Sequence, residues 1–329
     1  MHPLSLVKSN SSEGYTALSL KKGRGSCSFL GSNRRCTIYD HRTTYCRQFP
    51  YHIYVGDMVS VELNRSCRGT WTDNGADARL EAEDTIKNAN ERIKYAFMES
   101  KQVYGQFYSN CIEAGVMDDK HRIRGSFERN VDRFLDLNYI GNVLDASVDE
   151  PLMSLDDVGA KEVDMKDLEV ATMDIGMESI STKDPFNAPV YCDEGGNWNL
   201  FIGKKGNIEW MTLDDDGDLT KKDVFKADEV PLEPLLPEGM PILRDYLLTL
   251  NRRESFLGAT YHNMDVSDYE DSMANSYFGC MSVSILDLLW RCSLIDMLFG
   301  TGMGGRGIRE AILYYDMDRL DAPTIGAFV

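Results

Sequence analysis

The stretch from Tyr277 to Phe299 is the strongest constraint that the sequence places on the fold. It is the most apolar run in the chain and is long enough to span a bilayer, yet it contains Asp287, Arg291 and Asp296. Each charge at a bilayer centre costs roughly 2.5–3.5 kcal/mol on insertion scales. We therefore interpret the run as part of a buried core helix that covers residues 268–299, rather than as a membrane span.

The composition is that of a folded and strongly acidic chain. Of the 329 residues 43% are apolar, and the formal net charge is −18. A net charge this far from zero favours solubility and repels nucleic acid and anionic membranes. The start of the chain is polar and lacks the apolar segment of a secretory signal. We therefore expect a soluble, non-secreted protein of the cytoplasm or of a virion, without a membrane partner.

Charge is distributed unevenly along the chain, which suggests regions with different surroundings. Residues 1–70 hold ten Lys and Arg against four Asp and Glu, whereas residues 145–238 hold eight Lys and Arg against 24 Asp and Glu. We expect four regions: a basic β-rich region at 1–70, a helical hairpin at 71–147, an acidic linker or arm followed by a β-meander at 148–236, and a C-terminal helical region at 237–329.

The first two regions have different periodicities. Residues 51–63 alternate between apolar and polar on both sides of a Gly-Asp turn, which predicts a β-hairpin, and residues 35–39 are a further strand candidate. Apolar residues from Ala76 to Ala114, Ile86 among them, recur at helical spacing and predict one long helix. A second apolar face between Ile123 and Leu135 predicts the other helix of the hairpin.

The last two regions complete an α+β fold. The acidic stretch from Asp149 to Asp184 is weakly patterned, and we interpret it as a linker or as an arm that lies on a neighbour. Residues 197–213 alternate around a Gly-Lys-Lys-Gly turn and predict a hairpin, which a strand near Val224 extends into a meander. Further helices are expected from Pro241 and over residues 308–320.

An acidic turn after this hairpin is a candidate site for a divalent cation. Asp214, Asp216, Asp218 and Asp223 supply carboxylates around Gly217, and oxygen ligands suit hard cations. The loop departs from the EF-hand pattern at its first and last positions, and the strand before it does not fit that motif. A solvated acidic turn is the alternative interpretation.

A second candidate metal site lies in the basic region. Its sulfur and nitrogen donors are Cys27, Cys36, Cys46, Cys67, His41 and His52. Thiolate and imidazole are the usual ligands of zinc. The chain has no Cys-x-x-Cys pair, the spacings match no standard zinc knuckle, and buried thiols on strands explain these cysteines equally well. Residues 20–70 are also a candidate nucleic-acid-binding module, because they are basic.

No sequence signature of catalysis is present, since none of the five histidines lies in a Gly-x-Ser-x-Gly or His-Glu-x-x-His context. We therefore interpret the chain as a structural or assembly subunit of a multi-protein particle, such as a neck, tail or capsid-associated component of a phage. The basic first region and the acidic third region suit contacts between copies or with other assembly proteins. The expected contact residues are Arg24, Arg34, Arg35, Arg42 and Arg47.

Two alternatives stay open beside the assembly subunit. One is an enzyme that depends on a divalent metal held by the four aspartates of the acidic turn. The other is nucleic-acid binding by residues 20–70. The cofactors, the identity of the partners and the oligomer number are not determined by the sequence.

Overall fold

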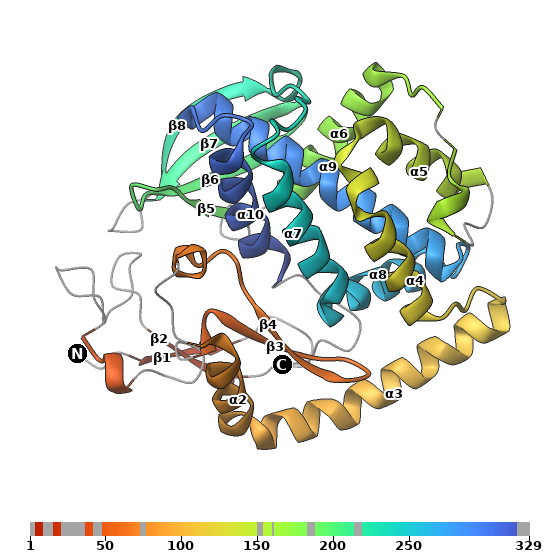
Figure 1. Cartoon of the computed structure of the whole chain (residues 1–329). Helices are drawn as coiled ribbons and strands as arrows, with labels where there is room; N and C mark the ends of the chain where they lie inside the picture. The colour runs from red at the N-terminus through yellow and green to blue at the C-terminus, as the bar shows by residue number, and fades with distance from the viewer. Residues whose placement is uncertain are drawn as a thin grey trace.

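The computed structural model has the predicted α+β organisation (Figure 1). It describes residues 4–8, 16–20, 37–41, 48–72, 77–149, 154–159, 161–182, 188–213 and 219–320. The helices are α2 (Ala78–Asn88), α3 (Asn90–Ala114), α4 (Lys120–Asn130), α5 (Leu137–Asp149), α6 (Met165–Ser179), α7 (Met240–Arg252), α8 (Glu254–Val266), α9 (Met273–Phe299) and α10 (Gly305–Arg319). The strands are β1 (Leu4–Lys8), β2 (Thr16–Leu20), β3 (Tyr51–Val55), β4 (Val59–Leu63), β5 (Val190–Cys192), β6 (Trp198–Lys204), β7 (Asn207–Leu213) and β8 (Leu219–Lys226).

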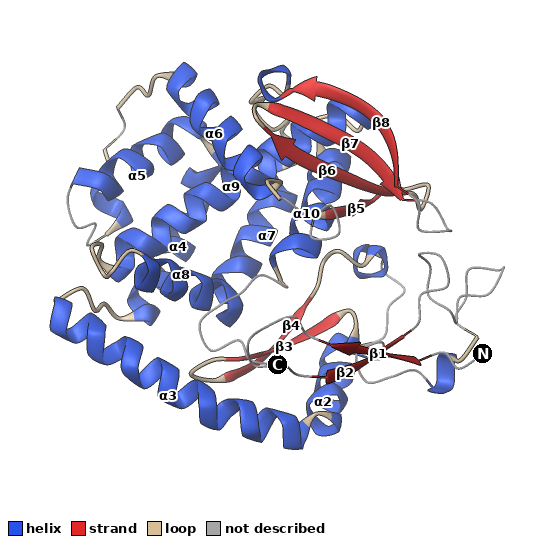
Figure 2. Ribbon diagram, turned by 180° about the vertical axis from the view of Figure 1, so that it is seen from behind, coloured by secondary structure: helices blue, strands red, loops and turns tan. Residues whose placement is uncertain are grey.

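Helix α9 forms the core of the fold. It begins after Ser272, whose side chain accepts a hydrogen bond from the backbone N–H of Asn275, and it ends at Gly300, which has a left-handed φ of 64°. Helices α5, α6, α8 and α10 pack around it (Figures 1 and 2). Within the described residues, α9 is the one helix long and apolar enough to cross a membrane, and 83% of its most apolar window is buried. The prediction of a buried core helix is confirmed.

Two of the charges inside this apolar run, Asp287 and Arg291, belong to one buried cluster of ion pairs. The guanidinium of Arg291 donates to Asp287 at 2.9 Å and to Asp318 at 2.6 Å, and Asp287 also accepts from Arg319 at 3.0 Å. Arg291 and Asp287 are almost completely buried. Because a buried charge is tolerated only when it is paired, this cluster explains how a core helix accommodates ionised side chains.

The predicted single helix from Ala76 to Ala114 is wrong, because the chain forms α2 and α3, which meet at Ala89. The backbone N–H of Ala89 bonds to the carbonyl of Ile86 at 3.1 Å, a 3₁₀-type contact that ends α2. Asparagines flank Ala89 on both sides, and their side chains compete with helical hydrogen bonds. The interruption leaves Ile86 38% exposed, whereas Ile93 is buried as predicted.

The second helix of the predicted hairpin is confirmed in part. Residues 120–130 form α4, and the chain continues as a 3₁₀ helix, η3 (Val131–Leu135). Phe127 and Phe134 are fully buried, with ring centroids 4.9 Å apart. The apolar periodicity therefore identified the buried face correctly.

The acidic stretch interpreted as a linker or arm contains α6, which packs against α9. The inward face of α6 carries Leu168, Thr172 and Gly176, all buried. A Cβ at Gly176 would overlap the indole of Trp290, so the two helices approach closely. Residues 165–179 are therefore a packed helix. The sequence did not reveal it because Thr172 and Gly176 occupy buried positions of the contact face and interrupt its apolar stripe.

Substitution of Gly176 tests this close approach. Gly176→Ala is expected to lower the free energy of unfolding by about 1–3 kcal/mol, because the methyl group must displace the buried ring of Trp290. The matched control is Gly105→Ala in α3, where nothing lies within 4 Å of an added Cβ. That change is expected to raise stability by about 0.5–1 kcal/mol. Urea denaturation followed by circular dichroism measures both, and effects of the same sign would contradict the packing.

The predicted meander is confirmed as a four-stranded antiparallel sheet in the order β5-β6-β7-β8. Lys205 and Gly206 form the turn between β6 and β7, with positive φ values of 51° and 77°. The sheet lies at one end of the helices, against α10 (Figure 2). Tyr191, Phe201 and Tyr314 are buried between the sheet and α10.

Two smaller hairpins lie in the first region. β1 pairs with β2, and β3 pairs with β4 in the register Tyr51↔Leu63 to Val55↔Val59, which confirms the predicted 51–63 hairpin. The strand expected at 35–39 is wrong for its described residues. Residues 37 and 38 form a turn that leads into the 3₁₀ helix η1 (Tyr39–His41).

Candidate metal-binding region and its docking surface

The described donors of the basic region lie on three different elements. Cys67 is a free, half-buried thiol at the N-cap of the 3₁₀ helix η2 (Arg68–Trp71). His52 lies on β3 opposite Glu62 and is half-buried, and His41 ends η1 and is exposed. In the part of the chain that the structure describes, no three His, Cys, Asp or Glu side chains gather as a metal site. Cys27, Cys36 and Cys46 lie outside the described residues.

The β3–β4 hairpin packs against the helices through its buried face (Figure 1). The hydroxyl oxygens of Tyr54 and Tyr104 lie 2.6 Å apart, and Ser100 in α3 donates to the backbone carbonyl of Gly56 at 2.6 Å. Gly258 in α8 provides the space for Tyr54, since a Cβ there would overlap the tyrosine hydroxyl. The hairpin is thus fixed against both α3 and α8.

Glu62, at the end of the hairpin, caps α8. Its carboxylate accepts a hydrogen bond from the backbone N–H of Ser255 at 2.9 Å and another from the Ser255 hydroxyl. Glu62 is 5% exposed. A carboxylate at a helix N-terminus satisfies an unpaired N–H group and interacts favourably with the helix dipole.

Asp316 of α10 binds the segment that follows β4. Its carboxylate accepts two hydrogen bonds of 2.8 Å from the guanidinium of Arg253, one of 2.6 Å from the backbone N–H of Arg65, and one from the hydroxyl of Tyr246. Arg253 also donates to the carbonyl of Leu63 at 2.9 Å. Burial, followed by the charge of Asp316, raises the pKa of Tyr246 well above its ordinary value, so this hydroxyl remains a donor.

Glu310, which precedes Asp316 on α10, binds η2. Both guanidinium nitrogens of Arg68 donate to its carboxylate at 2.6 Å, and the Tyr191 hydroxyl donates to it at 2.6 Å. Arg68 also donates to the carbonyl of Cys192 at 2.7 Å. The hydrogen bonds with Glu310 raise the pKa of Arg68 despite its burial. Cys67 thus lies between two anchored residues, Arg65 and Arg68.

The turn of the hairpin makes a further polar contact with α3 and α4. Asp57 pairs with Lys120 at 2.6 Å and accepts a hydrogen bond from the hydroxyl of Tyr108 at 2.9 Å. Lys120 lies 4.0 Å from Glu254, which pairs with Arg124 at 2.7 Å. Residues 51–72 are therefore connected to the helices at both ends of the hairpin.

Comparison with known protein families adds one finding to this geometry. Residues 5–94 match the family described as "CxxCxxCC: Putative zinc- or iron-chelating domain". The match covers less than half of the chain. No curated protein and no solved structure matches the chain. In this sequence no two cysteines are separated by two residues, so the spacing that names the family is not present.

The donor chemistry of the matched segment fits a metal of this kind. The segment holds the four cysteines at 27, 36, 46 and 67 and the two histidines at 41 and 52. Zinc in structural sites takes four thiolate or imidazole ligands, and soft thiolates also bind iron. The one described thiol of the set, Cys67, is free and half-buried. The nearby carboxylates already accept hydrogen bonds in the contacts between residues 51–72 and the helices: Glu62, Glu310 and Asp316.

The other residues that the sequence singled out are placed as follows. Asp214, Asp216 and Asp218 lie outside the described residues. Asp223 is an exposed residue of β8, and its carboxylate accepts from the neighbouring backbone N–H of Val224 at 2.8 Å. The five arginines expected to contact a partner also lie outside the described residues: Arg24, Arg34, Arg35, Arg42 and Arg47.

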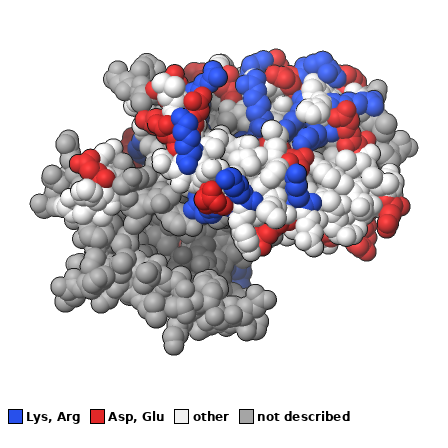
Figure 3. Space-filling model, turned by 90° about the horizontal axis from the view of Figure 1, so that it is seen from below, with Lys and Arg blue, Asp and Glu red and all other residues white. Residues whose placement is uncertain are grey.

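Charged groups on the described surface show no separation by sign in the view from below. Figure 3 shows Lys and Arg interspersed with Asp and Glu among uncharged residues over the described part of that face. The ion pair of exposed Lys94 and Glu91, at 3.0 Å, is a further example of neighbouring opposite charges among the described residues. Mixed charge is typical of a solvated surface.

The sequence pattern did not identify half-buried Arg68 or the buried residues Arg253, Glu310 and Asp316 as anchors. A signal was available in α10, where Glu310 and Asp316 enclose the apolar run Ala-Ile-Leu-Tyr-Tyr. The step of six residues places the two carboxylates about 120° apart around the helix, each with apolar neighbours in the sequence. A carboxylate on the apolar side of a helix is seldom buried without a partner, which would have predicted basic residues packed against α10.

Proposed function

We propose that residues 5–94 form a zinc- or iron-binding module that is held rigidly on the helical part of the chain. The observation that carries the proposal is the coincidence of the family match with the only part of the sequence that is dense in sulfur and nitrogen donors. Cys27, Cys36, Cys46 and Cys67 are the proposed thiolate ligands, with His41 and His52 as alternative nitrogen ligands.

The contacts that join residues 51–72 to the helices support a structural or sensing role for the bound ion. A metal ion binds more favourably when the backbone that carries its ligands is already fixed, because binding then loses little conformational entropy. Cys67 meets this condition, since Arg65 and Arg68 are tied to α10 through Asp316 and Glu310.

The metal content of the purified chain tests the proposal. We expect about one zinc or iron ion per chain by elemental mass spectrometry under reducing, oxygen-free conditions. Cys36→Ser and Cys46→Ser are each expected to lose most of this metal, because serine does not replace a thiolate ligand. The matched control is Cys280→Ser, a half-buried cysteine of α9 outside the matched segment, which is expected to retain the metal.

Cobalt(II) gives an independent readout of the ligands. Thiolate ligands produce charge-transfer absorption when they bind cobalt, and this absorption should disappear in Cys36→Ser and persist in Cys280→Ser. A wild-type chain that binds no metal, or a control that loses it to the same extent, would refute the module.

The earlier interpretation as an assembly subunit of a phage or other particle stays a prediction, as do its partners and its cytoplasmic or virion location. The enzyme that depends on Asp214, Asp216, Asp218 and Asp223 and the nucleic-acid-binding module at 20–70 also stay predictions. None of these is favoured by a contact among the described residues.

A further inference from the structure

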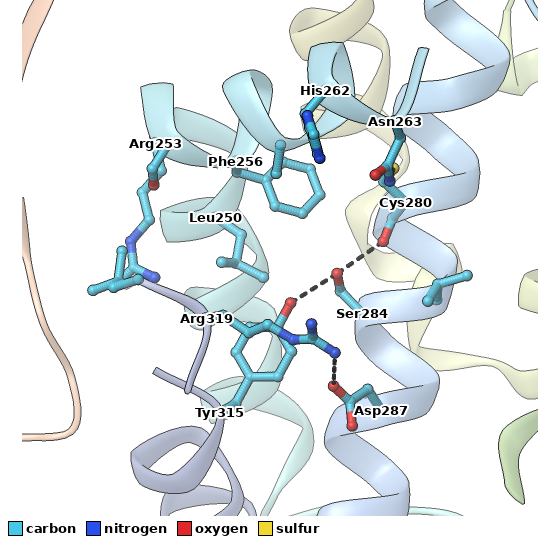
Figure 4. A pocket seen from close by; sticks show the side chains of 14 residues that line it. Leu250, Arg253, Phe256, His262, Asn263, Cys280, Ser284, Asp287, Tyr315 and Arg319 are labelled. Carbon is cyan, nitrogen blue, oxygen red and sulfur yellow. Dashed lines mark hydrogen bonds and ion pairs between the residues drawn. The ribbon is translucent and has the colours of Figure 1, made fainter. Parts of the chain in front are cut away.

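A cavity of about 380 Å³ lies between the α7–α8 pair, α9 and α10 (Figure 4). It borders the matched segment, because its lining residues Arg253 and Ser255 bind Leu63 and Glu62. Leu250, Phe256, Ala259, Val283 and Leu320 supply its apolar wall. Pockets for small molecules have volumes of about 300–1,000 Å³ and combine an apolar wall with a few placed polar groups. The size and lining of this cavity are therefore those of a ligand site.

Most polar groups on one side of the cavity already have partners. The Tyr315 hydroxyl donates to Ser284 at 2.8 Å, and the Ser284 hydroxyl donates to the carbonyl of Cys280 at 2.8 Å. Burial raises the pKa of Tyr315 to about 12, so its hydroxyl stays protonated. Asp287 accepts hydrogen bonds from Arg291 and Arg319, so the one carboxylate among the described lining residues is occupied.

Three of the groups at the cavity without a full set of partners are nitrogen donors. Within the described residues, half-buried His262 makes no hydrogen bond or ion pair, and its ring projects toward the cavity in Figure 4. Arg253 is 5% exposed, and its Nε–H has no acceptor among the described residues. Arg319 donates to Asp287 through Nη2 at 3.0 Å, and its Nε lies 3.6 Å from Asp318. Its side chain is 40% exposed, so the remaining nitrogen, Nη1, is available to a ligand.

We propose that this cavity binds a small organic carboxylate with an apolar body. A carboxylate is an acceptor without donors, which complements the guanidinium of Arg319 and the imidazole of His262. The apolar body would cover Phe256, Ala259 and Val283, which the cavity leaves in contact with water. A cationic ligand would find no unpaired carboxylate among the described lining residues, and a neutral one would leave these donors unpaired.

Three probes with the same apolar chain test the choice of head group. Octanoate, 1-octanol and octylamine are titrated into the full chain, and binding is followed by calorimetry and by the shift of the melting temperature. Octanoate is expected to bind about tenfold more tightly than 1-octanol, because a tenfold difference in affinity is about what one charge-assisted hydrogen bond supplies. Octylamine is expected not to bind. Equal binding of octanoate and 1-octanol would overturn the proposal.

Variants then locate the binding. Arg319→Gln is expected to weaken octanoate about tenfold and to leave 1-octanol unchanged, because the charged contact with the ligand is lost while the apolar wall remains. The change also removes one of the two guanidinium partners of Asp287. Ala259→Trp is expected to abolish binding of both by filling the cavity. The matched control is Val266→Trp on the same helix, at a position that is 73% exposed and outside the cavity. Octanoate binding that survives Ala259→Trp, or that is lost equally in Val266→Trp, would place the ligand elsewhere and refute this site.

Discussion

Replacement of Asp316 by Ala is expected to lower the free energy of unfolding by about 3–5 kcal/mol, among the largest effects of any single change in this chain. Asp316 is completely buried, and Arg253, its partner in two hydrogen bonds, is 5% exposed. Without the carboxylate, the guanidinium of Arg253 remains buried with only neutral acceptors. The backbone N–H of Arg65 and the hydroxyl of Tyr246 lose their acceptor as well.

Urea denaturation followed by tryptophan fluorescence measures this loss. The matched control is Asp245→Ala on α7, an exposed carboxylate, which is expected to change stability by less than about 0.5 kcal/mol. The double variant Asp316→Leu with Arg253→Met should recover a large part of the loss, because an apolar pair leaves no uncompensated buried charge. A loss below about 1 kcal/mol in Asp316→Ala would show that the carboxylate is not the buried anchor described above.

The position of Asp316 links this stability to the proposed metal module. Asp316 and Glu310 on α10 bind Arg65 and Arg68, and Cys67 lies between those two residues. Hydrogen exchange in Asp316→Ala should therefore rise at residues 63–72 more than in the sheet β5–β8. The contacts indicate that the matched segment is held firmly on the helices. Arg65 donates a backbone hydrogen bond to Asp316, and Arg68 forms an ion pair with Glu310.

Periodicity in the sequence predicted the elements whose buried faces are apolar. The alternation over 51–63 gave the β3–β4 hairpin, and the apolar run at 277–299 gave most of α9, as observed. Helix α6 was not predicted, because its contact with Trp290 is made by Gly176, a residue that adds nothing to an apolar stripe. The break at Ala89 was not predicted, because a single 3₁₀ contact hardly changes the spacing of apolar residues along the chain.

The candidate site was predictable in its chemistry but not in its geometry. The donors Cys27, Cys36, Cys46 and Cys67 identify a possible metal by residue type alone, whereas their spacing of nine, ten and twenty-one residues matches no standard motif. The buried ion pairs could not be paired from sequence, because Arg68 and Glu310 are brought together only by tertiary packing across most of the chain. Long-range pairing of this kind depends on the fold and not on local pattern.

The second large effect is expected at Asp287, the carboxylate buried inside the apolar core helix. Burial raises the pKa of Asp287, but its ion pairs with Arg291 and Arg319 outweigh burial, so its pKa lies below the ordinary value of 3.8. Its charge therefore stabilises the folded protein at neutral pH. This contribution is lost as the pH falls below about 4 and through the lowered pKa of Asp287 in the folded state. Asp287→Asn is expected to cost about 3 kcal/mol at pH 7, because Arg291 then keeps only Asp318 as a charged partner.

The pH dependence separates this ionic effect from a change in packing, since asparagine has nearly the shape of aspartate. Denaturant titrations at a series of pH values should show the difference in stability between wild type and Asp287→Asn at its full size near neutrality and shrinking below about pH 4. The control Asp271→Asn, at an exposed position before α9, should follow the wild type at every pH. A difference that stays constant as the pH falls would mean that Asp287 contributes through its shape or hydrogen bonds and not through its charge. The core helix would then tolerate Arg291 through Asp318 and the ring of Tyr314, which lies 4.3 Å from the guanidinium carbon.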